Sequence, residues 1–136
     1  MHIEIDLDTA TMEELNHFKS IIELKIREIE LAQERQKDKD MLRTYRNCLI
    51  GNVYSLRSCN PRINDEKVGL KSLIKDFVKS DDKQLCLKEN FVRILTYLTM
   101  EIYSQYQHRS NTLLDRKETQ FLLGEFLREL DKIEVE

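Results

Sequence analysis

The sequence predicts an all-α protein, a helical bundle of about five helices with a short N-terminal extended segment. Two observations favour this class. Apolar residues recur with helical spacing along most of the chain after residue 11. Turn-forming residues are scarce, with three glycines and one proline among 136 residues, which argues against a β-sandwich. A chain of this length fits one domain with its own core, so we expect a single helical domain over residues 1–136.

The first ten residues differ from the rest because polar and apolar side chains alternate over residues 2–7, as in a strand. Only residues 133–136 show a similar, weaker alternation. A lone strand leaves backbone groups unpaired, so this segment is expected to pair with that tail, to pair with another chain, or to remain an extended arm. Ile3 and Ile5 are therefore candidate contacts with a second copy or a partner.

Residues 11–58 contain two apolar stripes with helical spacing. Thr11 and Glu14 form a capping box at the start. Pro61 predicts the end of the segment. The first stripe consists of Leu15, Phe18, Ile22, Ile26 and Ile29, and the second of Leu42, Tyr45, Leu49, Val53 and Leu56.

The two stripes are separated by eight polar residues, 33–40, without glycine or proline. One unbroken helix over residues 11–58 would be about 72 Å long, whereas a domain of this size has a radius of gyration of about 14 Å. We therefore expect a turn near residues 37–40, with an aspartate capping the second helix. The alternative is a projecting rod that pairs with a second chain.

Residues 65–134 predict three further helices, which begin after Asn64-Asp65, after Ser80-Asp81-Asp82 and at Asp115. Asp115 and Glu118 form a second capping-box pattern. The middle helix is apolar on nearly every side, as is typical of a central helix or one with an additional partner. Tyr97 and Met100 lie off its main face and are candidate dimer or partner contacts.

Charge is unevenly distributed along the chain. The net charge of −3 is the sum of −5 over residues 1–40, +5 over residues 41–79 and −3 over residues 80–136. A basic middle between acidic ends favours an anionic partner or complementary packing in an oligomer.

Two groups of basic residues in this middle region are candidate binding sites. The partner-binding strip gathers on one side of a helix and comprises Arg43, Arg46, Tyr54 and Arg57. The alternative is that the arginine stems cover the margin of the core. The lysine row recurs every fourth residue and would bind anions, or would form a solvated face; it comprises Lys67, Lys71, Lys75 and Lys79.

Known enzyme signatures are missing from the sequence, which has no glycine-rich phosphate loop, nucleophile elbow or His-Glu-x-x-His motif. Three isolated cysteines and three isolated histidines have no metal-ligand spacing. Glu125, Glu129 and Asp131 are interpreted as a solvated face rather than a cation site. We therefore expect no catalytic residues, no metal and no cofactor.

These observations favour a small non-enzymatic module, an adaptor or inhibitor in a regulatory role, that binds a partner protein and forms a homodimer. The alternative is a nucleic-acid-binding protein, or a regulator of a nucleic-acid enzyme, that uses the basic segment 43–79. An all-α enzyme with carboxylates from several helices is a third alternative. An acidic opening and the lack of a long apolar run predict a cytoplasmic protein without a membrane segment.

Overall fold

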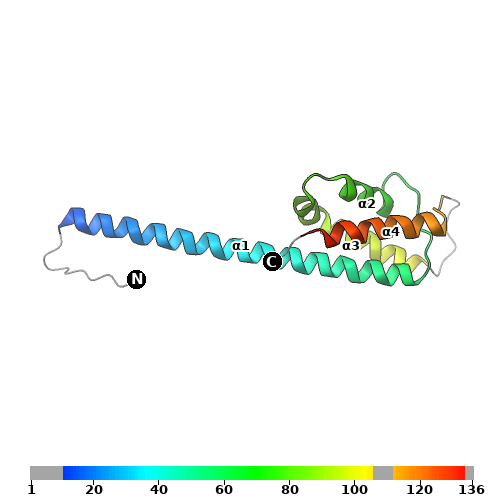
Figure 1. Cartoon of the computed structure of the whole chain (residues 1–136), viewed down its shortest axis with the longest axis horizontal. Helices are drawn as coiled ribbons and strands as arrows, with labels where there is room; N and C mark the ends of the chain where they lie inside the picture. Colours follow the sequence, from blue (N-terminus) through cyan, green and yellow to red (C-terminus); the bar gives the residue numbers. More distant parts are fainter. Residues whose placement is uncertain (1–10, 106–111, 134–136) are drawn as a thin grey trace. The chain divides into compact units, whose positions relative to one another are not determined.

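The structure is a computed structural model that describes residues 11–105 and 112–133. Four α-helices account for most of these residues: α1 (Met12–Ser58), α2 (Leu70–Lys79), α3 (Lys83–Ser104) and α4 (Arg116–Asp131) (Figure 1). The predicted all-α class is confirmed, with four helices in the described ranges rather than about five. The expected strand over residues 2–7, with Ile3 and Ile5, lies outside the described residues.

The ends of α1 follow the predicted local signals. The Thr11 amide donates to the Glu14 carboxylate at 3.3 Å, and the Glu14 amide donates to the Thr11 hydroxyl at 3.2 Å, which completes the capping box. At the other end Asn60 adopts the left-handed conformation with φ of 48°, and its amide donates to the carbonyl of Arg57. Asparagine tolerates this conformation, which turns the chain before Pro61.

The turn expected near residues 37–40 does not form, because α1 continues through these residues. Most residues of the stretch 33–40 are Gln, Glu, Arg or Lys, which lose little side-chain freedom in a helix. Asp40 does not cap a new helix. Its carboxylate pairs with Arg43 at 3.6 Å, and its carbonyl accepts from the Thr44 hydroxyl at 2.9 Å. A turn would break several backbone hydrogen bonds that this helix retains.

The chain divides into two compact units, residues 1–38 and 39–136, and α1 belongs partly to each. In the first unit the described residues, 11–38, are almost all helical, and none of their side chains is buried. Among the residues that the structure describes, every buried apolar one belongs to the second unit, so the core of the expected helical domain lies there.

The core of the second unit forms where α2, α3 and α4 pack around residues 42–56 of α1 (Figure 1). The rings of Phe77 and Phe126 pack edge to face with their centroids 5.3 Å apart, and this contact holds α2 against α4. The rings of Tyr45 and Phe91 stack with their centroids 3.8 Å apart, and this contact holds α1 against α3. The most completely buried side chains include Leu49, Val53, Leu56, Ile63, Ile74, Leu87, Ile94, Leu98, Leu123 and Leu130.

Residues 62–65, between α1 and α2, are extended rather than helical, and the chain bends at residues 67–69, so α2 begins at Leu70 and not after Asp65 as the sequence predicts. Backbone pairing with the segment before α4 holds residues 62–65 in this form. The Leu114 amide donates to Ile63 at 2.9 Å, and the Asp65 amide donates to Thr112 at 2.8 Å. These partners lie about fifty residues apart, so local sequence patterns do not reveal them.

The starts of α3 and α4 agree with the predicted caps. Asp82 accepts from the amide of Leu85 at 3.1 Å, and Asp115 accepts from the amide of Glu118 at 2.7 Å. Each cap satisfies one of the amides that the first helical turn leaves without a partner.

Candidate interaction surfaces

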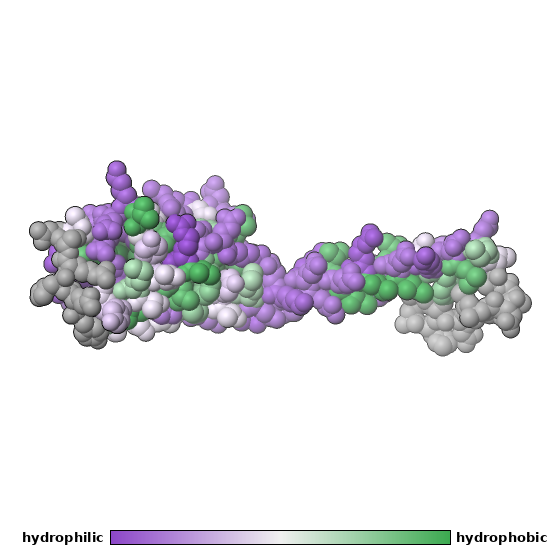
Figure 2. Space-filling view, turned by 180° about the vertical axis from the view of Figure 1, so that it is seen from behind, coloured by the Kyte–Doolittle hydropathy of each residue, from purple (hydrophilic) through white to green (hydrophobic). Residues whose placement is uncertain are grey.

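The most extensive exposed apolar surface in the first unit lies along residues 12–31 of α1. Ile22, Ile26 and Ile29 are each about half exposed, at 49%, 50% and 49%. Leu15 and Phe18 are partly exposed on the same face. We call Leu15, Phe18, Ile22, Ile26 and Ile29 the N-terminal stripe. Figure 2 shows apolar side chains as a band along this helix, with hydrophilic side chains beside them.

The N-terminal stripe has the same spacing as the buried stripe of the second unit. Steps of three, four, four and three residues separate its members, and the same steps separate Leu42, Tyr45, Leu49, Val53 and Leu56. Apart from the partly exposed Tyr45, which stacks on Phe91, the members of this second stripe are buried. A stripe with this spacing therefore suits contact with other helices, and the N-terminal stripe carries the same pattern in exposed form.

A second exposed apolar face lies on α3. Leu85, Val92, Met100 and Tyr103 fall within an arc of about 80° around the helix. Val92 and Tyr103 are 71% and 72% exposed. The two predicted contact residues of this helix lie on different faces. Met100 lies on this outer face, whereas Tyr97 is partly buried and packs against the core.

The partner-binding strip predicted on α1 is largely engaged within the second unit. Arg46 donates to the carbonyl of Ile133 at 2.8 Å. Arg57 donates to the side chain of Gln120 at 2.9 Å, and the Gln120 amide donates back to the carbonyl of Arg57. Arg57 thus links α1 to the first turns of α4, and Arg46 links α1 to the residues that follow the end of α4. Of the other strip residues, Arg43 pairs with Asp40 and Tyr54 is exposed.

The predicted lysine row does line one shallow depression, of about 280 Å³, although Lys67 precedes the start of α2. Asp65, Glu66 and Asp76 line the same depression, and Lys71 forms an ion pair with Asp65. The four lysines Lys67, Lys71, Lys75 and Lys79 are therefore close together, but the surface around them is nearly balanced in charge.

A larger groove, of about 730 Å³, lies between α2 and α4 around Phe121, which is 65% exposed. Lys71 and Lys75 of α2 and Lys117 of α4 line it, together with two glutamates. The sequence pattern does not single out Phe121. Its neighbours Leu122 and Leu123 are buried, so only its angular position around α4 distinguishes it from a core residue.

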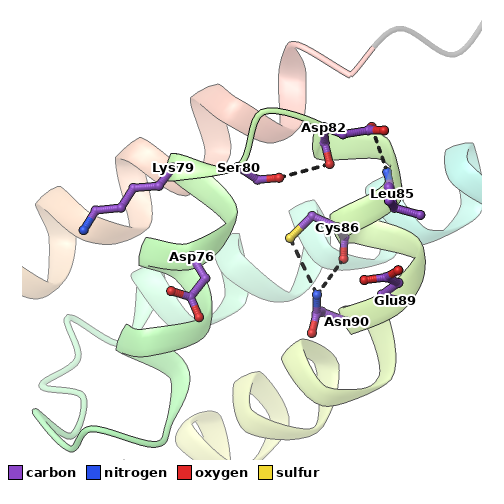
Figure 3. A pocket seen from close by; sticks show the side chains of 8 residues that line it. All are labelled: Asp76, Lys79, Ser80, Asp82, Leu85, Cys86, Glu89 and Asn90. Carbon is purple, nitrogen blue, oxygen red and sulfur yellow. Dashed lines mark hydrogen bonds between the residues drawn. The ribbon is translucent and has the colours of Figure 1, made fainter.

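A depression of about 350 Å³ lies between the end of α2 and the start of α3, beside Cys86 (Figure 3). Burial raises the pKa of the Cys86 thiol above its usual value, and the hydrogen bond from Asn90 opposes this shift only in part. The Asn90 amide donates to the Cys86 carbonyl at 3.0 Å and to the sulfur at 3.6 Å. A thiol with a raised pKa is protonated at neutral pH and is a poor nucleophile or metal ligand.

The acidic residues that the sequence analysis considered for cation binding are not arranged as ligands. Glu129 accepts a hydrogen bond from Lys132 at 2.9 Å and pairs with Lys83 at 3.4 Å. Across the described part of the chain, no three Asp, Glu, His or Cys side chains converge on a point where a metal could bind. No helix there is both long and apolar enough to cross a bilayer.

Comparison with known proteins gave no match. No family model, curated protein or solved structure matches the chain. The function of the protein is therefore inferred from its surfaces.

Proposed function

We propose that this protein is a non-enzymatic protein-interaction module that binds a helix of a partner protein with the N-terminal stripe of α1. One observation carries the proposal: five apolar side chains with core-like spacing lie on residues 15–29, where three of them are about half exposed, two are partly exposed and none of the described side chains is buried. An apolar face of this kind is typical of helices that dock against another helix or into a groove.

The exposed apolar surface of the stripe can contribute to binding. Each half-exposed isoleucine contributes about 1 kcal/mol when its remaining surface is buried, and the less exposed Leu15 and Phe18 contribute less, so the stripe contributes on the order of 4 kcal/mol. A partner face of similar size adds as much again. This sum lies within the range of estimates, about 4–15 kcal/mol, of the cost of lost translational and rotational freedom, so weak to moderate binding is expected from the apolar contacts alone.

A photo-reactive side chain tests the proposal. We expect a benzophenone amino acid in place of Ile26 to cross-link the full chain to a partner protein in the cells that make it. The matched control carries the same group in place of Ser20, which is exposed and lies about 120° away around α1. Cross-links at position 26 and not at position 20 support the proposal. Equal labelling at both positions, or none at position 26, contradicts it.

A second candidate function is nucleic-acid binding through the lysine row, favoured by the four lysines that line one depression. If all four contact phosphates, the affinity for an oligonucleotide falls with salt with a log–log slope of about −3 to −4. The three carboxylates beside them weaken this candidate. Titration with single- and double-stranded oligonucleotides at about 50 mM salt tests this candidate, because contacts with phosphates are strong when salt is dilute. Undetectable binding there eliminates it.

A further inference from the structure

We infer that the partner of the N-terminal stripe is a second copy of this chain, aligned parallel to the first. This inference rests on the proposed function, because it names the occupant of the same stripe. The charges beside the stripe carry it. Counting about 100° per residue, Glu14 and Lys25 lie on one flank, and Lys19 and Glu30 lie on the other.

The charged residues on the two flanks match each other across a two-fold axis. When two parallel helices pair, one flank of the first faces the opposite flank of the second, offset by about five residues. Glu14 then meets Lys19 of the second copy, and Lys25 meets Glu30 of the second copy. Each pair occurs twice in the symmetric dimer, so four oppositely charged pairs border the apolar seam.

An antiparallel pair fits the charges less well. The apolar spacing reads the same in both directions around Ile22, so the stripe alone allows either orientation. The antiparallel pair retains one favourable contact, Lys19 with Glu23 of the second copy. It also brings Glu14 near Glu28 of the second copy, where like charges repel. The charges therefore favour the parallel arrangement.

The lysines can form these contacts because their present pairs are weak. Lys19 lies 4.0 Å from Glu23, and Lys25 lies 3.6 Å from Glu28. The side chains of Lys19 and Lys25 are 75% and 67% exposed, and ion pairs that exposed contribute little to stability. Their ammonium groups can therefore turn toward a second helix at small cost.

Sedimentation equilibrium of the full chain tests the inference. We expect a mass twice the 16.3 kDa of the monomer, and a monomer for the double variant Ile22→Lys/Ile26→Lys. The matched control is Leu24→Lys/Leu31→Lys, which adds the same charge at two exposed apolar residues on the opposite side of α1 and is expected to leave the dimer intact. All these positions lie outside the buried core, so the second unit folds in every variant.

A charge exchange tests the orientation. Glu30→Lys and Lys25→Glu, each alone, place like charges opposite one another in the parallel dimer and are expected to weaken dimerisation about 3- to 10-fold. An equimolar mixture of the two variants restores both attractions, so the heterodimer is expected to recover the wild-type affinity. Unchanged affinity of the single variants, or no recovery in the mixture, overturns the parallel pairing.

The outcomes separate this inference from the proposed function. A wild-type chain that stays monomeric at all concentrations, while position 26 cross-links to a different protein, overturns the second copy and leaves the proposed function standing. A monomer without any cross-link at position 26 overturns both. A dimer that persists in the Ile22→Lys/Ile26→Lys variant overturns the stripe as its interface.

Discussion

Lys83, Glu129 and Lys132 connect the end of α2 to α4 through a small polar network. The Lys83 ammonium donates to the carbonyls of Phe77, Val78 and Ser80 at 3.3, 3.0 and 2.9 Å, and its positive charge interacts favourably with the C-terminal end of α2. The same ammonium pairs with Glu129. A lysine in this position holds two helices together with a single side chain.

The Glu129 carboxylate makes the stability of the second unit dependent on pH. The hydrogen bond from Lys132, assisted by Lys83, holds the pKa of Glu129 below its ordinary value. Its stabilising effect is therefore fully present above the ordinary carboxyl pKa of about 4.3 and is lost as the pH falls through the lowered value. We expect Glu129→Gln to lower the free energy of unfolding by about 1–2 kcal/mol at pH 7.

Urea denaturation at pH 7 and at pH 3 checks this expectation. The difference in the free energy of unfolding between wild type and Glu129→Gln should be smaller at pH 3, because this pH lies below the ordinary carboxyl pKa and part of the stabilising effect of the Glu129 carboxylate is lost there. Glu125→Gln, one turn earlier on α4, is the control for a lost charge on the same helix. A difference that is the same at both pH values would show that the ion pairs do not stabilise the protein.

Arg46 and Arg57 of the predicted strip contact other parts of the second unit, and their sequence pattern does not identify these partners. Because Arg46 donates to the carbonyl of Ile133, we expect Arg46→Met to destabilise the second unit by about 1–2 kcal/mol. Arg43→Met, at a more exposed position on the same helix, should change stability by less than about 0.5 kcal/mol. Thermal unfolding of both variants measures the difference. Equal effects would mean that the contact with Ile133 contributes nothing.

At the scale of elements, the sequence predicts the helices well where the signals are local. Thr11, Asp82 and Asp115 cap their helices as expected, because a cap depends on residues only three positions apart. The extended segment 62–65 was not predicted, because its pairing with residues 112–114 joins parts of the chain that are distant in sequence.

The two stripes of α1 show why an interaction surface is harder to predict than a helix. The N-terminal stripe and the stripe from Leu42 to Leu56 have the same spacing and similar side chains. Only the packing of α2, α3 and α4 determines that the second is covered and the first is exposed. Periodicity therefore reveals an apolar face, but it does not reveal which surface will cover that face.

A proline in the polar stretch tests the independence of the two parts of α1. Lys37→Pro removes a helical hydrogen bond and should cost about 3 kcal/mol locally. The buried residues of α1 begin at Leu42, so we expect a loss of helicity in circular dichroism without a shift of the main thermal transition. Lys37→Ala, which retains the helix, is the control. A proline variant that lowers the main transition by several degrees would show that the core depends on the earlier residues.

At the scale of the whole molecule, the division at residue 38 predicts that the second unit folds alone. A chain of residues 39–136 retains the buried core, and Asp40 lies at its new helix start, where an aspartate stabilises free amides. We expect it to unfold cooperatively in urea with a midpoint close to that of the full chain, and to be monomeric. A truncated chain that fails to fold, or that still dimerises, would contradict this division of roles.

The folded second unit and the self-associating segment 15–29 are expected to respond differently to protein concentration. Self-association through residues 15–29 should protect the backbone amides of that segment only as dimers form, because an isolated helix opens frequently in water. The amides of residues 42–56 lie in the folded core and should be protected at every concentration.

Hydrogen–deuterium exchange of the full chain at about 1 μM and about 100 μM, analysed by peptide mass spectrometry, measures this difference most directly, over a range of concentrations typical for weak to moderate dimers. We expect exchange over residues 15–29 to slow markedly at the higher concentration, with no change over residues 42–56. Exchange over residues 15–29 that is equally fast at both concentrations would contradict pairing of the stripe with a second copy.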